Sequence, residues 1–243
     1  MTKTVMWAVL LSLCPVATAE ESETRDEPLE QADAQQSADE RPEQEDAEAQ
    51  TVTSALPIYI PPNRGAAKSR VGAATRGPRT DLGKLLVLAP DHVGLSSDPQ
   101  PKLYWYLDRD SDTRIDLSVI DDRNAAPLLE RTLVPPVKRG FHVIDCAAHG
   151  ITMEPGRIYQ WFVAFVPQPS RRSHDVIAGG AVEVTSVRST AGASADTLAR
   201  DGLWYDAVAV LQRRYRDHPD DARTLAALNG LAEQVDLELN VAR

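Results

Sequence analysis

The sequence is poor in cysteine and aromatic residues and has no long apolar run. It contains 2 cysteines, and aromatic residues make up 5% of the chain. Its most apolar stretch, residues 5–13, is far shorter than the roughly 20 residues that a membrane-spanning helix needs. We therefore expect no transmembrane span.

The N-terminus has the order of parts of a secretory signal peptide. Lys3 supplies the charge, residues 5–13 the apolar core, and Ala17-Thr18-Ala19 a small-residue cleavage site. Cleavage after Ala19 predicts a signal peptide over 1–19 and an exported protein, either periplasmic or secreted. A lipid-anchored precursor is the alternative for Cys14, although Leu13 and Pro15 beside it do not suit a lipoprotein.

Cleavage at that site would leave Cys146 as the one remaining cysteine. An internal disulfide is then excluded, although the exported compartment would permit one. Cys146 is either a free thiol or part of an intermolecular disulfide.

The negative charge is concentrated in one segment. Residues 20–54 hold 13 acidic and 2 basic residues, whereas residues 55–243 hold 23 of each. A segment so charged and without aromatic residues predicts a disordered acidic linker, with an acidic lure for a basic partner or for divalent cations as the alternative. The rest of the chain is neutral and has no aromatics interleaved with its basic residues, so we do not expect it to bind nucleic acid.

Residues 55–83 form a basic segment with regularly placed glycines. No acidic residue lies between Leu56 and Thr80. Glycines let main-chain amides approach an anion, and arginines grip carboxylates or phosphates. The segment could bind an anionic glycan, a lipid head group or an acidic protein face; alternatively it lies extended across the next domain. The candidate binding residues are Arg64, Lys68, Arg70, Arg76 and Arg79.

Short apolar segments separated by turn residues follow over 84–188. Seven such segments favour an antiparallel sandwich of immunoglobulin or fibronectin type, so the fold class is mainly β. Alternation puts Trp105 on one face of its strand and Tyr104 and Tyr106 on the other. The spacing from Pro155-Gly156 to Tyr159 is typical of a tyrosine corner. The predicted strands are 85–88, 102–107, 114–120, 127–133, 141–146, 157–166 and 176–187.

The pattern becomes helical over 194–240, with Pro219 between two helices. Apolar residues recur at helical spacing in both: Trp204, Val208, Leu211 and Tyr215 in the first, and Leu225, Leu228, Ala232 and Val235 in the second. The stretch Gly202-Leu203-Trp204-Tyr205-Asp206-Ala207, closed by Pro219, is similar to the second half of a tetratricopeptide unit. Since such repeats need about three copies to be stable, these helices should pack on the sandwich instead of forming an open array.

No catalytic motif is present. The chain lacks a G-x-S-x-G elbow, a complete phosphate loop and a dinucleotide fingerprint, so we predict neither an enzyme nor a cofactor. A group of possible metal ligands favours a buried thiol and a core histidine over a metal site; its members are His142, Asp145, Cys146 and His149. An unrecognised hydrolase would need loops to bring together His92, His174, Asp91 and Asp175.

Several motifs between Tyr59 and Asp236 together resemble the bacterial exported family labelled domain of unknown function 928. They are Tyr59-Ile60-Pro61-Pro62-Asn63-Arg64-Gly65, Thr75-Arg76-Gly77, Leu88-Ala89-Pro90 with Gly94, Leu103-Tyr104-Trp105-Tyr106, Glu154-Pro155-Gly156 with Tyr159 and Trp161, Arg172-Ser173-His174-Asp175, and Gly202-Leu203-Trp204-Tyr205-Asp206-Ala207. The resemblance implies an exported bacterial protein and no assigned catalysis.

These features favour a non-enzymatic protein of the bacterial envelope that binds another protein, periplasmic or extracellular. A glycan-binding module is the alternative, with Tyr104, Tyr106 or Trp204 as stacking surfaces. Besides the basic segment, we expect Arg172 and Asp175 in an exposed loop, and Trp204, to contribute to binding.

Overall fold

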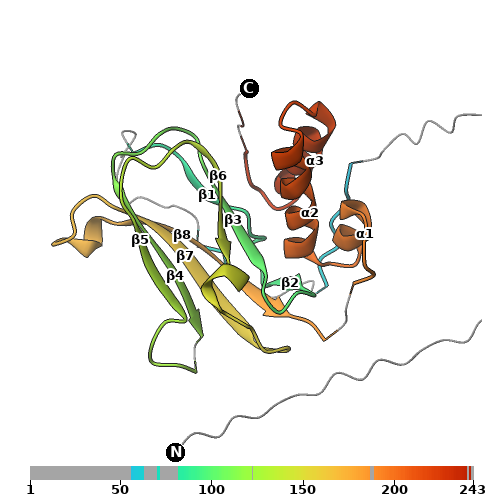
Figure 1. Ribbon diagram of the computed structural model, residues 1–243, viewed down its shortest axis with the longest axis horizontal. Coiled ribbons are helices and arrows are strands. Elements are labelled where there is room, and N and C mark those ends of the chain that lie inside the picture. Colours follow the sequence, from blue (N-terminus) through green and yellow to red (C-terminus); the bar gives the residue numbers. More distant parts are fainter. Residues whose placement is uncertain are drawn as a thin grey trace, which may run out of the picture. The chain divides into compact units, whose positions relative to one another are not determined.

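The computed structural model describes residues 56–62, 70–71, 82–121, 123–186, 189–239 and 241, and these belong to one compact unit of the chain. The acidic segment 20–54 and the proposed signal peptide lie outside these ranges. The described part is mainly β, with two sheets and three C-terminal α-helices (Figure 1).

The smaller sheet is antiparallel and has three strands in the order β1-β3-β6. Its strands are β1 (Leu85–Val87), β3 (Lys102–Leu107) and β6 (Gly140–Asp145). A short 3-10 helix, Ala147–His149, follows β6.

The larger sheet has five strands in the order β2-β8-β7-β4-β5 and is antiparallel except for the β2–β8 pair. Its strands are β2 (Gly94–Ser96), β4 (Arg114–Asp121), β5 (Leu129–Leu133), β7 (Ile158–Val166) and β8 (Val176–Val184). A 3-10 turn, Arg172–His174, precedes β8. All seven predicted strands are present, and β2 is an eighth strand, among the described residues, that the sequence analysis missed.

Alternating side chains build the core between the sheets. Leu117, Val163 and Ala178 lie in one row across β4, β7 and β8, and all three are buried. In the next row Trp161 lies opposite Gly180. A Cβ at Gly180 would come within 2.4 Å of the Ala89 Cβ, so only glycine lets the chain segment after β1 approach the sheet this closely.

The helices are α1 (Ala195–Arg200), α2 (Trp204–Asp217) and α3 (Ala222–Glu233). Ser194 caps α1 and Asp221 caps α3, each by accepting a hydrogen bond from a main-chain N–H of the first turn. Pro219 lies in the turn between α2 and α3, as predicted. The three helices lie together on one side of the sheets (Figure 1). No helix in the described ranges is long and apolar enough to cross a membrane.

Helix α2 covers the face of β3 that carries Tyr104 and Tyr106. The predicted alternation on β3 is confirmed, but every residue from Leu103 to Leu107 is buried. Tyr106, Phe141 and Tyr215 form a ladder of rings with centroid distances of 5.0 and 5.4 Å. The outward face of the strand is therefore buried under a helix, and neither tyrosine is available as a stacking surface.

Candidate functional site

Of the predicted basic residues, the structure describes only Arg70; Arg64, Lys68, Arg76 and Arg79 lie outside the described residues. The Arg70 guanidinium donates to the carbonyls of Val235 (2.6 Å), Ala89 (3.3 Å) and Asp236 (3.5 Å). Val235 and Asp236 follow the end of α3, where carbonyls lack helical partners and favour a cation. Arg70 thus fixes the end of the helical part to the chain after β1.

The neighbouring Val71 pairs with the free edge of β8. Its N–H and carbonyl each form a 2.9 Å hydrogen bond with Gly179. At these two residues the main chain of the basic segment lies against the sheet, although the Val71 side chain is 43% exposed. This agrees with the alternative that the segment crosses the domain in an extended form.

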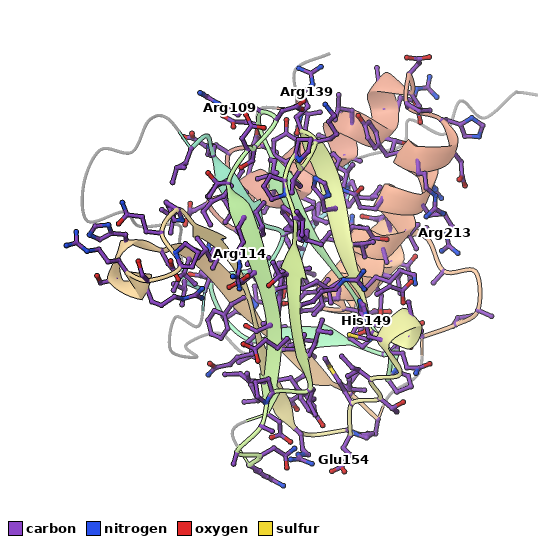
Figure 2. The ribbon with its side chains drawn as sticks, turned by 60° about the vertical axis from the view of Figure 1, so that its left-hand side comes forward. Arg109, Arg114, Arg139, His149, Glu154 and Arg213 are labelled. Atoms are coloured by element: carbon purple, nitrogen blue, oxygen red, sulfur yellow. The ribbon has the colours of Figure 1, made fainter. Side chains whose placement is uncertain are left out.

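Arg172 and Asp175, predicted as binding residues, belong to an ion network on the outer face of the larger sheet. Arg172 donates from Nη1 to Asp116 Oδ2 (2.8 Å), and its Nε lies 2.9 Å from Asp175 Oδ2. Arg114, labelled on this face in Figure 2, donates to both oxygens of Asp116. Thr132, opposite Asp116 on β5, donates to Oδ1 at 2.9 Å.

The prediction that Asp175 lies exposed in a loop is wrong. Only 2% of its side chain is exposed, against 54% for Arg172. Asp175 Oδ1 and Nδ1 of the adjacent His174 are both buried and have no hydrogen-bond partner among the described residues. The cause is the 3-10 turn before β8, which folds Asp175 inward beneath Arg172.

The two carboxyls of this network have pKa values shifted in opposite directions. Burial raises the pKa of Asp175, although the Arg172 charge opposes this. Burial also acts on Asp116, but hydrogen bonds from Arg114, Arg172 and Thr132 outweigh it and hold the pKa of that carboxyl below its usual value. The network can therefore order the turn. Its charged groups pair with one another, so they are poorly placed to bind a ligand.

These shifts predict how stability depends on pH. An unfolded Asp titrates near about 3.9. Between that value and the raised folded pKa, the unfolded chain has lost the Asp175 proton while the folded chain still holds it. The wild type should therefore lose stability relative to Asp175→Asn as pH rises through the raised folded pKa. Urea unfolding of both proteins at a series of pH values from acidic to neutral measures the difference.

Asp116→Asn is the matched control, because the folded pKa of Asp116 is lowered. In that comparison the wild type should gain stability as pH rises through the lowered folded pKa toward the unfolded value. A wild type that gains stability relative to Asp175→Asn with rising pH would show that the Arg172 pairing dominates over burial.

The residues of the hydrolase hypothesis do not form one site in the described structure. His92 Nδ1 lies 3.0 Å from Asp91 Oδ1, and its Nε2 lies 2.8 Å from the Tyr59 hydroxyl. β2, which follows His92, pairs with the C-terminal end of β8, whereas Asp175 precedes its N-terminal end. Sequence reasoning missed Tyr59 as the partner of His92, since 33 residues separate the two.

The possible metal ligands around β6 have other partners. His142 stacks on Trp105 with centroids 4.2 Å apart, and its Nε2 lies 2.8 Å from the Lys138 carbonyl. Cys146 is fully buried, and burial raises the pKa of its thiol to about 12. Within the described ranges, no group of three or more His, Cys, Asp or Glu residues could hold a metal ion.

Trp204, predicted as a binding residue, is a core residue. It is 1% exposed, and its Nε1 donates to the Leu88 carbonyl at 2.9 Å. Its ring meets Tyr59 edge to face at 4.9 Å. No part of the indole is available for stacking on a ligand.

A groove does open between β6 and the turn that joins α2 to α3. Two adjoining hollows of ≈ 520 Å³ and ≈ 190 Å³ share Arg139, Tyr215 and Val241. We call them the Arg139 groove. Phe141 and Tyr106 complete its aromatic floor, and Pro219–Ala222 with Leu225 form the wall opposite.

Arg139 is the charged residue of the β6 side of this groove. Figure 2 labels it at the upper end of the sheets, beside the helical part. Its main-chain N–H donates to Asp110 Oδ1 (2.9 Å), while its exposed guanidinium has no hydrogen bond or ion pair within the described residues. Burial raises the pKa of the Tyr106 phenol and the Arg139 charge lowers it, so this cation acts on the floor of the groove.

Sequence reasoning did not identify the Arg139 groove. Helical spacing put Tyr215 on the same face of its helix as Trp204, but it did not show that this part of the helix meets Phe141 on β6. Nothing in the local sequence distinguishes Arg139 from the other arginines, because its position depends on the packing of α2 against β3.

Comparison with known proteins confirms the family resemblance seen in the sequence. No curated protein matches the chain. The model of the family described as Domain of Unknown Function (DUF928) matches residues 71–243, a range that leaves out the Tyr59–Gly65 motif and contains both sheets and all three helices. The protein is thus a member of the DUF928 family.

Proposed function

We propose that the protein is a non-enzymatic binding module of the bacterial envelope, exported after cleavage behind Ala19, and that a partner protein binds in the Arg139 groove. The single observation that carries the proposal is this groove. Its hollow of ≈ 520 Å³ falls within the range of about 300–1,000 Å³ found for small-molecule sites, so it has room for side chains of a partner. The rest of the proposal rests on the leader and on the lack of catalytic motifs.

The chemistry of the groove supports a polypeptide ligand. Half-buried Phe141 and Tyr215 offer an apolar floor, and Arg139 offers an unpaired cation beside it. Aromatic residues and arginine carry most of the energy in protein interfaces. An apolar side chain on the partner would match the floor and a carboxylate would match Arg139, while Asp220 and Asp221 on the opposite wall favour a basic residue of the partner on that side.

A glycan is the second candidate, because Tyr215 and Phe141 could also stack on a sugar ring. The tryptophans within the described ranges are all 0–1% exposed, so sugar binding would not be reported by their fluorescence. Glycan arrays probed with wild type and Tyr215→Ala provide the direct comparison.

The fold suggests two structural relationships. We propose that the two sheets are related to immunoglobulin or fibronectin-like sandwiches, supported by the 2.9 Å hydrogen bond from the Glu154 N–H to the Tyr159 hydroxyl, which is the contact expected of a tyrosine corner. The relation of α1 and α2 to a tetratricopeptide unit stays a prediction.

Affinity capture from an envelope extract tests the binding proposal, with the chain from Glu20 onward as bait. Arg139→Glu should reduce retention of the specific partner at least about tenfold, because a buried charge pair lost at an interface costs about 2–5 kcal/mol. Arg131→Glu is the matched control, since Arg131 is an exposed arginine on β5. Equal retention by both variants, or capture of no specific protein, would contradict the proposal.

A further inference from the structure

The segment Leu56–Pro62 lies extended beside the helices and is drawn in cyan next to α1 in Figure 1. Its side chains alternate between the inside and the outside. Pro57 and Tyr59 are buried, whereas Leu56, Ile58 and Ile60 are 50%, 47% and 41% exposed. We call residues 56–62 the Tyr59 strap.

The helical part binds mainly the main chain of this strap. Gln234 donates from Nε2 to the Pro57 carbonyl and accepts from the Tyr59 N–H, both at 2.8 Å. The Ile60 N–H donates to the Ala199 carbonyl at 3.1 Å. All three bonds reach main-chain groups of the strap, which are also the groups that proteins use to bind extended peptides, and they do not depend on the side chains of the strap.

One side chain of the strap supplies a specific anchor. The Tyr59 ring packs edge to face on Trp204, and its hydroxyl lies 2.8 Å from His92 Nε2. Asp91 holds the other ring nitrogen of His92 at 3.0 Å. The pocket therefore combines an aromatic wall with a polar end, which suits a tyrosine better than a phenylalanine.

The prolines after Tyr59 pass close to the turn between α1 and α2. Gly202 has a φ of 76°, and a Cβ there would lie 3.0 Å from Pro62 Cδ and 3.1 Å from the Ile60 carbonyl. A glycine in this left-handed conformation leaves room for the Pro61-Pro62 stretch. The turn is thus matched to a proline-rich chain at this distance from the tyrosine.

We infer that the pocket formed by His92, Trp204, Gln234 and the α1–α2 turn is a recognition site for an extended segment with a tyrosine flanked by prolines. The Tyr59 strap is its resident occupant, and a partner protein with a segment of the same chemistry competes with it. The contacts themselves carry this inference, because they use main-chain groups, one tyrosine and the following prolines. The side chains on the outer face of a bound segment would be exposed to solvent, as those of Leu56, Ile58 and Ile60 are, so the pocket would not select their identity.

The strap is covalently part of the chain, and this link determines whether the wild type or a variant with a weakened strap binds a partner segment. An attached segment has an effective local concentration in the millimolar range, so a free peptide should hardly displace the intact strap. In a chain with Tyr59→Ala the strap keeps its main-chain bonds but loses the ring and hydroxyl contacts, so a peptide that makes both sets of contacts should displace it more readily.

The test uses a fluorescein-labelled peptide with the sequence of residues 55–63 and the chain from Glu20 onward carrying Tyr59→Ala. Fluorescence anisotropy should show saturable binding to this variant, and binding at least tenfold weaker to the wild type. A peptide with alanine at the tyrosine position should bind at least tenfold more weakly, and adding Gln234→Ala should weaken binding to a similar extent.

Two results would overturn the inference: no saturable binding to a folded Tyr59→Ala chain, or equal binding of the two peptides. Cooperative thermal unfolding shows whether the variant is folded. If it is not, Tyr59→Phe replaces it, since this change keeps the ring against Trp204, loses the hydrogen bond to His92 and should bind the peptide more tightly than the wild type does. Arg139→Glu should leave peptide binding unchanged, because the Arg139 groove lies at the first turn of α3 and Gln234 at its end.

Discussion

Replacing Trp204 by alanine should lower the free energy of unfolding by about 3–5 kcal/mol. The indole is 1% exposed, so its loss leaves a large cavity between α2 and the chain after β1. The change also removes the donor of the Leu88 carbonyl and the ring that packs on Tyr59. Urea unfolding followed by circular dichroism measures the effect.

Trp204→Phe is the matched control for this prediction. It keeps much of the buried ring but loses the hydrogen bond to Leu88, so its cost should be clearly smaller than that of alanine. A loss below about 0.5 kcal/mol for Trp204→Ala, the size seen for ordinary surface changes, would mean that the helical part contributes little to the core.

Removing the Tyr205 hydroxyl should cost about 2–4 kcal/mol, because it leaves two buried groups without a partner. This hydroxyl accepts from Trp161 Nε1 at 3.0 Å and donates to the Ala181 carbonyl at 2.9 Å. Burial raises the pKa of the phenol far above its usual value, so the hydroxyl stays protonated and can donate. Tyr205→Phe tests this with almost no change in volume.

Tyr215→Phe provides the comparison from the other end of α2. Its ring is half-buried against Phe141, and its hydroxyl forms no hydrogen bond with the described residues. This change should alter the unfolding free energy by less than about 0.5 kcal/mol. Similar losses for the two variants would contradict the role given to the Tyr205 hydroxyl.

Local patterns in the sequence predicted most of the strands and helices. Alternation and turn residues placed seven strands, among them β4 and β7, close to their observed bounds. β2 was missed because it is three residues long and its partner, the C-terminal end of β8, lies more than 80 residues further along the chain. No local pattern reports such a pairing.

The candidate site was harder to predict, because burial depends on which element covers which face. Trp204 was expected at helical spacing, and it is there, but its contacts with Leu88 and Tyr59 make it a core residue. Asp175 is a residue type common in exposed turns, which is why the sequence indicated exposure. The 3-10 helix before β8 instead buries its side chain. Arg139 acquires its neighbours Tyr215 and Val241 only when the C-terminal part is in place.

The contacts of Trp204 and Tyr205 also constrain when the domain can finish folding. Both side chains come from the first turn of α2, yet their hydrogen bonds end on Leu88, Trp161 and Ala181, within and beside the strands. During synthesis all eight described strands precede these two residues in the chain. The sheets therefore cannot complete their packing before Trp204 and Tyr205, which follow all eight described strands in the chain, have reached their places between Leu88, Trp161 and Ala181.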